Sequence, residues 1–161
     1  MKVIDNFLNN KDFEYIRDQI INIKFPWYYN DNSNYAHDGI AQLTYSFYFW
    51  DNPTRVNGNI QLLKPILDKL NVKGLIRIKA NLNFPSSDKK PIYHIDSPFK
   101  KTKTAVYYLN SNNGGTKFKD KFVESKENRI VIFNTQTKHS AIPHDNNKQA
   151  RFVINFNYYE E

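Results

Sequence analysis

The second half of the chain is a succession of short segments rich in β-branched and aromatic residues, and this pattern constrains the fold more than any other feature. Clusters of Pro, Asn, Gly or Lys separate the segments, which cover residues 92–96, 104–109, 116–118, 122–124, 129–134 and 151–158. Many short strands at close spacing are typical of a β-sandwich or a barrel. We therefore predict a jelly-roll-like core.

Two of the predicted strands alternate in polarity, so that each has an apolar and a polar face. In residues 75–83 the polar face carries Arg77, Lys79, Asn81 and Asn83. In residues 151–157 one face carries Phe152, Ile154 and Phe156, and the other carries Arg151, Val153, Asn155 and Asn157. For Lys79 we weigh two interpretations, a salt bridge with a carboxylate near a site and the covering of a sheet edge.

The first half of the chain predicts two helices ahead of these strands. Apolar spacing favours helices over 10–22, capped by Asn9 or Asn10, and over 59–70, where Pro65 would produce a kink. Residues 41–50 read as a strand and residues 28–39 as a loop. The predicted fold class is α+β, mainly β, in one domain over 1–161, with a helical support over about 1–73 and core strands over about 74–158.

Composition excludes several classes of protein. The 161 residues include no cysteine, which rules out disulfide scaffolds, thiolate metal sites and cysteine nucleophiles. No stretch approaches a membrane span, and the charged start of the chain is unlike a signal peptide, so we expect a cytoplasmic protein. The formal net charge of +7 favours an anionic partner, either a nucleic acid or a small polycarboxylate.

His94 and Asp96 are the first candidates for chemistry. They stand two apart in the strand-like segment 92–96, so both side chains would project from one face, with Ile95 pointing into the core behind them. An imidazole beside a carboxylate can supply two ligands to one metal ion. The pattern is short, and a strand histidine can equally be a hydrogen-bonded structural residue.

A third ligand strengthens the metal hypothesis. His139 follows the apolar segment 129–134, and two histidines with one carboxylate form the facial triad that suits non-haem Fe(II). His144 competes for this role, but it follows Pro143 and fits a connecting loop better. His37 falls in a polar segment and reads as a solvated side chain.

Arg151 opens the alternating strand 151–157. An arginine inside a β-barrel must pair with an anion, because an unpaired buried charge is very costly. Its planar fork matches a carboxylate in a bidentate manner. The triad together with Arg151 therefore indicates a metal site with a carboxylate-bearing co-ligand beside it.

These residues lie in blocks that resemble the 2-oxoglutarate/Fe(II)-dependent dioxygenases, and among them the prolyl 4-hydroxylase-like branch. The order and spacing of the blocks match over roughly residues 75–158. The blocks are His94-Ile95-Asp96-Ser97-Pro98, residues 104–110 (TAVYYLN), residues 114–118 (GGTKF), residues 129–133 (RIVIF), His139 and Arg151. The first half is similar to the family only in its layout, with helices ahead of a double-stranded β-helix, or jelly roll.

The resemblance implies a role for each site residue. His94, Asp96 and His139 would bind Fe(II), and Arg151 would pair with the distal carboxylate of the co-substrate 2-oxoglutarate. Tyr108 would hydrogen-bond the same carboxylate, although a core tyrosine is the competing interpretation. Asn81 or Asn83 would lie near the co-substrate, where the family usually has a tyrosine.

The implied activity uses O2 and 2-oxoglutarate and gives succinate and CO2. The substrate would be the side chain of a free or peptidyl amino acid, which is hydroxylated. One alternative is oxidative demethylation of a nucleic acid, which would need an aromatic and basic lid; Trp27, Tyr28, Tyr29 and Tyr35 could line either groove. The other is a jelly-roll binding module without activity.

Overall fold

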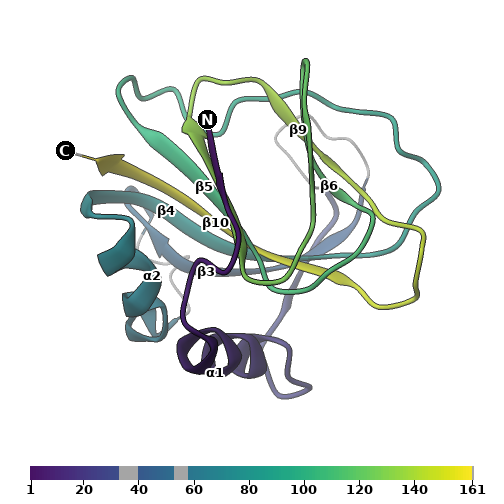
Figure 1. Ribbon diagram of the computed structural model, residues 1–161, viewed down its shortest axis with the longest axis horizontal. Helices are drawn as coiled ribbons and strands as arrows, with labels where there is room; N and C mark the ends of the chain where they lie inside the picture. The colour runs from purple at the N-terminus through teal and green to yellow at the C-terminus, as the bar shows by residue number, and fades with distance from the viewer. Residues whose placement is uncertain (33–39, 53–57, 161) are drawn as a thin grey trace.

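Strands dominate the structure, and two α-helices lie on one side of them (Figure 1). The computed structural model describes residues 1–32, 40–52 and 58–160. The helices are α1 (Asn10–Ile20), the short 3₁₀ helix η2 (Ile60–Leu63) and α2 (Lys64–Lys69). The strands are β1 (Lys2–Ile4), β2 (Tyr28–Asn30), β3 (Gln42–Phe49), β4 (Val72–Asn83), β5 (Lys103–Tyr108), β6 (Gly115–Phe118), β7 (Phe122–Glu124), β8 (Arg129–Asn134), β9 (His139–Ile142) and β10 (Arg151–Glu160).

In the described part of the chain, the strands form two antiparallel sheets. The larger sheet has seven strands in the order β1-β8-β5-β10-β4-β3-β2, and the smaller has three in the order β7-β6-β9. A single β-bridge between His94 and His139 adds the segment around His94 to the outer edge of β9. This arrangement confirms the predicted jelly-roll core, a double-stranded β-helix.

Strand β10 lies in the middle of the larger sheet and pairs with β4 on one side and β5 on the other. The pairing with β4 aligns the polar faces that the sequence predicts. Four cross-strand pairs follow one another along this face, namely Arg151 with Asn83, Val153 with Asn81, Asn155 with Lys79, and Asn157 with Arg77. The sheet therefore carries a ladder of polar side chains on the face opposite its helices.

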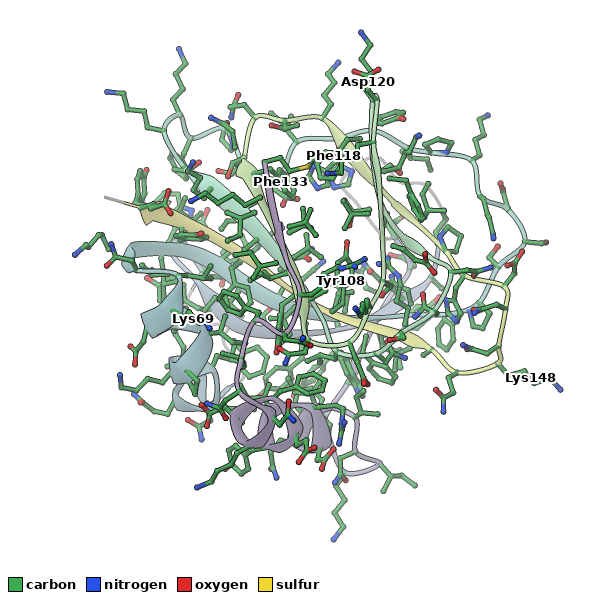
Figure 2. All side chains as sticks on the ribbon, viewed as in Figure 1. Lys69, Tyr108, Phe118, Asp120, Phe133 and Lys148 are labelled. Atoms are coloured by element: carbon green, nitrogen blue, oxygen red, sulfur yellow. The ribbon has the colours of Figure 1, made fainter. Side chains whose placement is uncertain are left out.

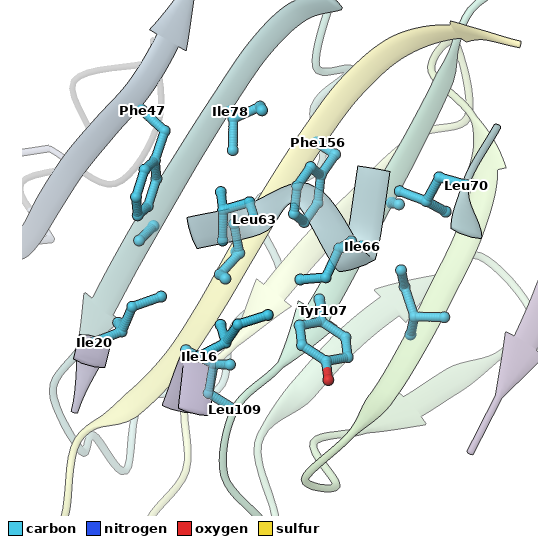
Figure 3. Close-up of a cluster of buried hydrophobic side chains, with 14 of the residues drawn as sticks. Ile16, Ile20, Phe47, Leu63, Ile66, Leu70, Ile78, Tyr107, Leu109 and Phe156 are labelled. Atoms are coloured by element: carbon cyan, nitrogen blue, oxygen red, sulfur yellow. The ribbon is translucent and has the colours of Figure 1, made fainter. Parts of the chain in front are cut away.

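The helices cover the apolar face of this large sheet. Ile16 and Ile20 of α1, with Leu63 and Ile66 of η2 and α2, are fully buried in one cluster with Ile78 and Phe156 of the sheet (Figure 3). The asparagine cap of α1 is confirmed, because the Asn9 side chain accepts a hydrogen bond from the backbone N–H of Asp12 at 3.0 Å.

The second predicted helix differs in detail from the structure. Residues 60–63 form the 3₁₀ helix η2, and α2 then begins at Lys64. Pro65 lies in the first turn of α2 rather than inside a longer helix. A proline is tolerated there, because the first N–H groups of a helix have no partner within it. The expected kink is therefore wrong.

A second apolar cluster occupies part of the space between the two sheets. It contains Val106, Tyr108, Phe118, Val123, Val131, Phe133 and Val153. Figure 2 shows Tyr108, Phe118 and Phe133 in this interior, whereas Asp120 and Lys148 point outward. The Phe118 and Phe133 rings meet edge to face at 5.0 Å. This cluster lies next to the row of polar side chains on β4 and β10.

One predicted strand is wrong. Residues 92–96 do not form a strand, and only His94 makes a bridge. Ile92 donates its backbone N–H to the Ser140 hydroxyl at 2.8 Å instead of to a neighbouring strand. Ile95 is 37% exposed and does not point into the core. Conversely, β2 forms where the sequence pattern predicts a loop, and β9 forms in a stretch for which the sequence pattern predicts no strand.

The described helices give no membrane-spanning candidate, because each is too short or too polar to cross a bilayer. His37 and Tyr35 lie outside the described residues.

Asn128 joins the amino-terminal segment to the core by hydrogen bonds, and its replacement should lower the stability of the fold. Its side chain accepts hydrogen bonds from the Leu8 N–H at 2.9 Å and the Tyr107 hydroxyl at 2.7 Å, and it donates to the Leu8 carbonyl at 2.9 Å. Its backbone also has a positive φ of 57°, which favours asparagine over alanine. We expect Asn128→Ala to lower the free energy of unfolding by roughly 3 kcal/mol, because three buried groups lose their partner.

Urea denaturation followed by circular dichroism measures this loss. Asn10→Ala is the matched control, since Asn10 is exposed, and it should change the free energy of unfolding by less than about 0.5 kcal/mol. Similar stabilities of the two variants would contradict the role given to Asn128.

Candidate metal centre and its cavity

The structure brings His94, Asp96 and His139 together at one point. Their ligand atoms lie within 4.8 Å of one another. The Nε2 atoms of His94 and His139 are each 3.6 Å from Oδ1 of Asp96. Two imidazole nitrogens and one carboxylate oxygen at these distances are the ligand set of a facial triad. The structure thus brings together the three residues that the sequence analysis proposes as metal ligands, and their role as ligands stays a prediction.

Backbone pairing places the two histidines opposite each other. The His94 N–H donates to the His139 carbonyl at 2.9 Å, and the His139 N–H donates to the His94 carbonyl at 3.0 Å. Such a reciprocal pair is the hydrogen-bonded site of an antiparallel ladder. It holds the centroids of the two imidazole rings 4.6 Å apart, although one ring comes from an irregular segment and the other from β9.

The second nitrogen of each imidazole contacts a backbone carbonyl. Nδ1 of His139 is 2.9 Å from the Thr137 oxygen, and Nδ1 of His94 is 3.3 Å from the Ile92 oxygen. A carbonyl only accepts, so these contacts favour the proton on Nδ1 and leave the lone pair of Nε2 directed at the cluster. The donor set thus fits a divalent metal ion.

Asp96 is held by two residues that the sequence does not single out as its partners. Its Oδ2 accepts a hydrogen bond from Nδ2 of Asn157 at 3.1 Å, and its Oδ1 lies 3.5 Å from Nη2 of Arg77. Arg77 in turn donates through Nε to Oδ1 of Asn157 at 3.0 Å. Because Asn157 occupies Oδ2, Oδ1 stays directed at the two histidines. Support of this kind orients metal-binding carboxylates in general.

Burial and charge shift the pKa values in this cluster in different directions. Burial raises the pKa of Asp96, but the contact with His94 and the charge of Arg77 outweigh it and hold this pKa well below its usual range. Burial lowers the pKa of His139, which favours the neutral ring that binds metals. Burial also lowers the pKa of His94, but the Asp96 carboxylate outweighs it and gives a net increase.

The cluster opens into a cavity of about 1160 Å³. Arg77, Lys79, Asn81, Asn83 and Arg151 line its wall. The only carboxylates among the described lining residues are Asp96 in the interior and the exposed Asp88 at the rim. The interior of the cavity is therefore electropositive, which suits an anionic ligand.

Arg151 is buried in this wall, with 2% of its surface exposed. One of its terminal nitrogens donates to Oδ1 of Asn83 at 3.4 Å, while its Nε has no hydrogen-bond partner. No carboxylate of the described residues pairs with it. Burial lowers the pKa of Arg151, yet a guanidinium stays charged inside proteins. An unsatisfied buried cation at a cavity wall is the arrangement that a bound carboxylate completes.

The other three predicted co-substrate residues differ in their placement. Asn81 and Asn83 line the cavity, and Oδ1 of Asn81 has no hydrogen-bond partner. Tyr108 is fully buried and does not line the cavity; its hydroxyl lies 2.6 Å from the Thr116 hydroxyl, and Thr116 does line it. The sequence gives no signal for Thr116 beyond its place beside Gly114 and Gly115.

Lys79 also lines the cavity. Its strand β4 lies between β10 and β3, so the interpretation that it covers a sheet edge is wrong.

The aromatic residues of the segment before β3 divide between core and rim. Tyr28 and Tyr29 are exposed and line the cavity mouth. Trp27 instead packs against Phe25 at 4.8 Å and Phe152 at 5.9 Å between ring centroids, so its predicted place in a substrate groove is wrong.

His144 is fully buried apart from the cluster, and its Nε2 contacts the Gln149 carbonyl. We expect His144→Ala to leave metal affinity nearly unchanged and to lower the free energy of unfolding by roughly 1–3 kcal/mol, since a buried contact is lost. Metal titration by calorimetry and urea denaturation measure the two effects. Loss of metal binding by the folded variant would mean that His144 is a ligand.

Comparison with known proteins gives likeness in structure alone. No family model matches the chain. No curated protein matches it in sequence. A prolyl hydroxylase from Trichoplax adhaerens, solved in complex with a hypoxia-inducible-factor peptide, is 18% identical with a TM-score of 0.67, over 99% of this chain and 83% of its own. A Pseudomonas putida prolyl-4-hydroxylase is 14% identical with a TM-score of 0.62, over 99% and 92%.

A third similar structure is the non-haem α-ketoglutarate-dependent epimerase SnoN from nogalamycin biosynthesis. It is 11% identical with a TM-score of 0.68, over 98% of this chain and 75% of its own. These likenesses show that the chain has the double-stranded β-helix fold of 2-oxoglutarate/iron oxygenases.

Proposed function

We propose that the chain is an Fe(II)- and 2-oxoglutarate-dependent dioxygenase that hydroxylates the side chain of a free or peptidyl amino acid. The observation that carries this proposal is the pairing of two features in one cavity. One is the cluster of His94, Asp96 and His139. The other is the buried Arg151, whose Nε has no partner. A metal ion with a dicarboxylate beside it satisfies both.

The residues present fit both groups. The two imidazoles direct Nε2 at the cluster and Asp96 directs Oδ1, so three ligands are ready for the metal. Arg151 offers the fork of a guanidinium to the distal carboxylate of 2-oxoglutarate, and Asn83 and Asn81 stand beside it. Tyr108 acts on this carboxylate through Thr116, which its hydroxyl contacts.

When bound, iron with 2-oxoglutarate and O2 supplies the oxidation that converts a substrate C–H to C–OH and yields succinate and CO2. This chain's residues supply position and shelter. Arg151 would hold the co-substrate at one end, so that its keto-acid end faces the triad. The apolar wall of Val106 and Val153 would exclude water between these two points.

The similar structures support this assignment in different ways. SnoN is described in complex with Fe3+, α-ketoglutarate and nogalamycin RO, and the Trichoplax enzyme in complex with a peptide. The first supports the metal and the co-substrate, and the second supports an amino-acid side chain as the substrate.

The test is conversion of 2-oxoglutarate to succinate by the purified protein with Fe(II), O2 and a panel of amino acids and peptides. We expect succinate only when Fe(II) is present, and none from the His94→Ala variant. Absence of iron-dependent succinate, together with absence of 2-oxoglutarate binding, would reject the proposal in favour of a binding module.

A further inference from the structure

Lys79 has no partner in the part of the chain that the structure describes. It lines the cavity, yet its ammonium group makes no hydrogen bond or ion pair with any described residue. Lys79 directly follows Arg77 on the inward face of β4, and Arg77 is the residue that contacts Asp96. Successive inward residues of a strand are about 6.6 Å apart, so Lys79 lies close to the metal cluster.

Two cations of the interior therefore lack a carboxylate. Arg77 has Asp96, whereas Lys79 and Arg151 have none among the described residues. Burial and the neighbouring charge of Arg77 lower the pKa of Lys79 to about 7, and the more weakly acting charge of Asp96 opposes this shift without cancelling it. An anion beside this ammonium would offset part of that desolvation cost and favour the charged form of Lys79.

The co-substrate does not account for Lys79. One carboxylate of 2-oxoglutarate would pair with Arg151, and the other would bind on the open side of the metal. Both carboxylates then have a cation of their own. Lys79 is then left without a carboxylate in contact, and a carboxylate of the substrate would supply one.

The residues around Lys79 indicate a second property of the ligand, an N–H donor. Asn155 lies opposite Lys79 on β10 and Ser46 lies opposite it on β3, and both line the cavity. The buried Oδ1 of Asn155 has no hydrogen-bond partner, and neither has Oδ1 of Asn81 one pleat further along β4. A carbonyl oxygen of this kind accepts from an N–H donor. The cation is thus flanked by two unused acceptors.

We propose that Lys79 binds the carboxylate of the substrate while Asn155 accepts a hydrogen bond from the nitrogen next to that carboxylate. The substrate is then a free amino acid or the carboxyl-terminal residue of a peptide, oxidised on its side chain. This inference rests on the proposed function, and it narrows the substrate to compounds with a free α-carboxylate.

Binding is tested first, without turnover. Protein labelled with ¹³C at lysine Cε is saturated with Zn(II) and 2-oxoglutarate, and the Lys79 signal is assigned by its absence in Lys79→Met. The twenty L-amino acids are then added one at a time, and each that binds is compared with its carboxamide, its N-acetyl form and a dipeptide ending in it.

We expect at least one free acid to raise the pKa midpoint of the Lys79 signal, and its carboxamide to leave the midpoint unchanged. If the dipeptide also binds and shifts the Lys79 midpoint, the carboxylate belongs to a peptide terminus. If neither the dipeptide nor the N-acetyl form binds, the substrate is a free amino acid. Lys79→Met should weaken binding of the acid by roughly tenfold or more, and Lys79→Arg should restore part of it.

Lys148→Met is the matched control, because Lys148 is exposed, points outward (Figure 2) and is not among the described residues that line the cavity. It should leave binding of the acid unchanged. The affinity for 2-oxoglutarate, measured in the same samples, should be equal in wild type, Lys79→Met and Lys148→Met.

Thymidine monophosphate is added in a separate titration as a nucleotide probe. Four results would overturn the inference. The first three are binding of no amino acid, equal binding of acids and carboxamides, and a response of Lys79 to thymidine monophosphate but to no amino acid. A large loss of 2-oxoglutarate affinity in Lys79→Met would also overturn it, by assigning the lysine to the co-substrate. Failure of the proposed function is distinct, because wild type would then bind neither metal nor 2-oxoglutarate.

Discussion

Iron binding is expected to be lost when His94 is replaced by alanine. The variant keeps Asp96 and His139 but lacks one of three ligands, and affinity should fall by roughly a hundredfold or more, since even the residues that support ligands contribute 10–100-fold. Succinate formation should fall below detection. Calorimetric titration with Fe(II) under anaerobic conditions measures the affinity, and a succinate assay measures turnover.

His94 is the best of the three ligands for this test, because its side chain is 29% exposed whereas Asp96 is 4% exposed. Its removal therefore disturbs packing least. His144→Ala is the control that removes a buried imidazole outside the cluster. If His94→Ala binds Fe(II) as tightly as wild type and stays folded, the cluster is not the metal site.

The second large effect concerns Arg151. Replacement by methionine keeps most of the side-chain volume and removes the guanidinium, so the distal carboxylate of 2-oxoglutarate would lose a charge-assisted, bidentate partner. Truncating such a buried pair costs about 2–5 kcal/mol, which corresponds to roughly 30- to 4000-fold in affinity. We expect 2-oxoglutarate binding to weaken within this range, with Fe(II) affinity nearly unchanged.

Titrating the Zn(II)-loaded protein with 2-oxoglutarate measures this loss without turnover. Arg129→Met is the matched control, since Arg129 lies at the surface, where it pairs with Asp5, and should not alter 2-oxoglutarate binding. Equal loss of metal and co-substrate affinity in Arg151→Met would show that Arg151 supports the fold of the cavity instead of holding the ligand.

Much of this site is readable from the sequence because its residues follow the alternation of strands. The polar faces of residues 75–83 and 151–157 appear in the structure as predicted, and they place Arg151 inside the cavity. His139 is distinguishable from His144 because it directly follows a strand and a turn. Period-two alternation is a local property, and it survives whatever the strand pairs with.

The features that the sequence does not give depend on contacts between distant segments. Arg77 and Asn157 meet Asp96 only because β4, β10 and the irregular segment converge there. The strand around His94 is absent since Ile92 bonds to a serine hydroxyl from β9, a contact without any local signal. Likewise, the sequence cannot show that the strand of Lys79 is an interior one.

The central place of β10 has a consequence for folding while the chain is being synthesised. β10 follows β4 and β5 in chain order, yet it lies between them in the sheet, so both leave the ribosome before it. Until β10 emerges, the edges of β4 and β5 that will pair with it carry unpaired backbone N–H and C=O groups. Such edges promote association with other nascent chains. A translational pause before Arg151 would therefore expose the protein to misassembly at the moment when its anion-binding wall is still unfinished.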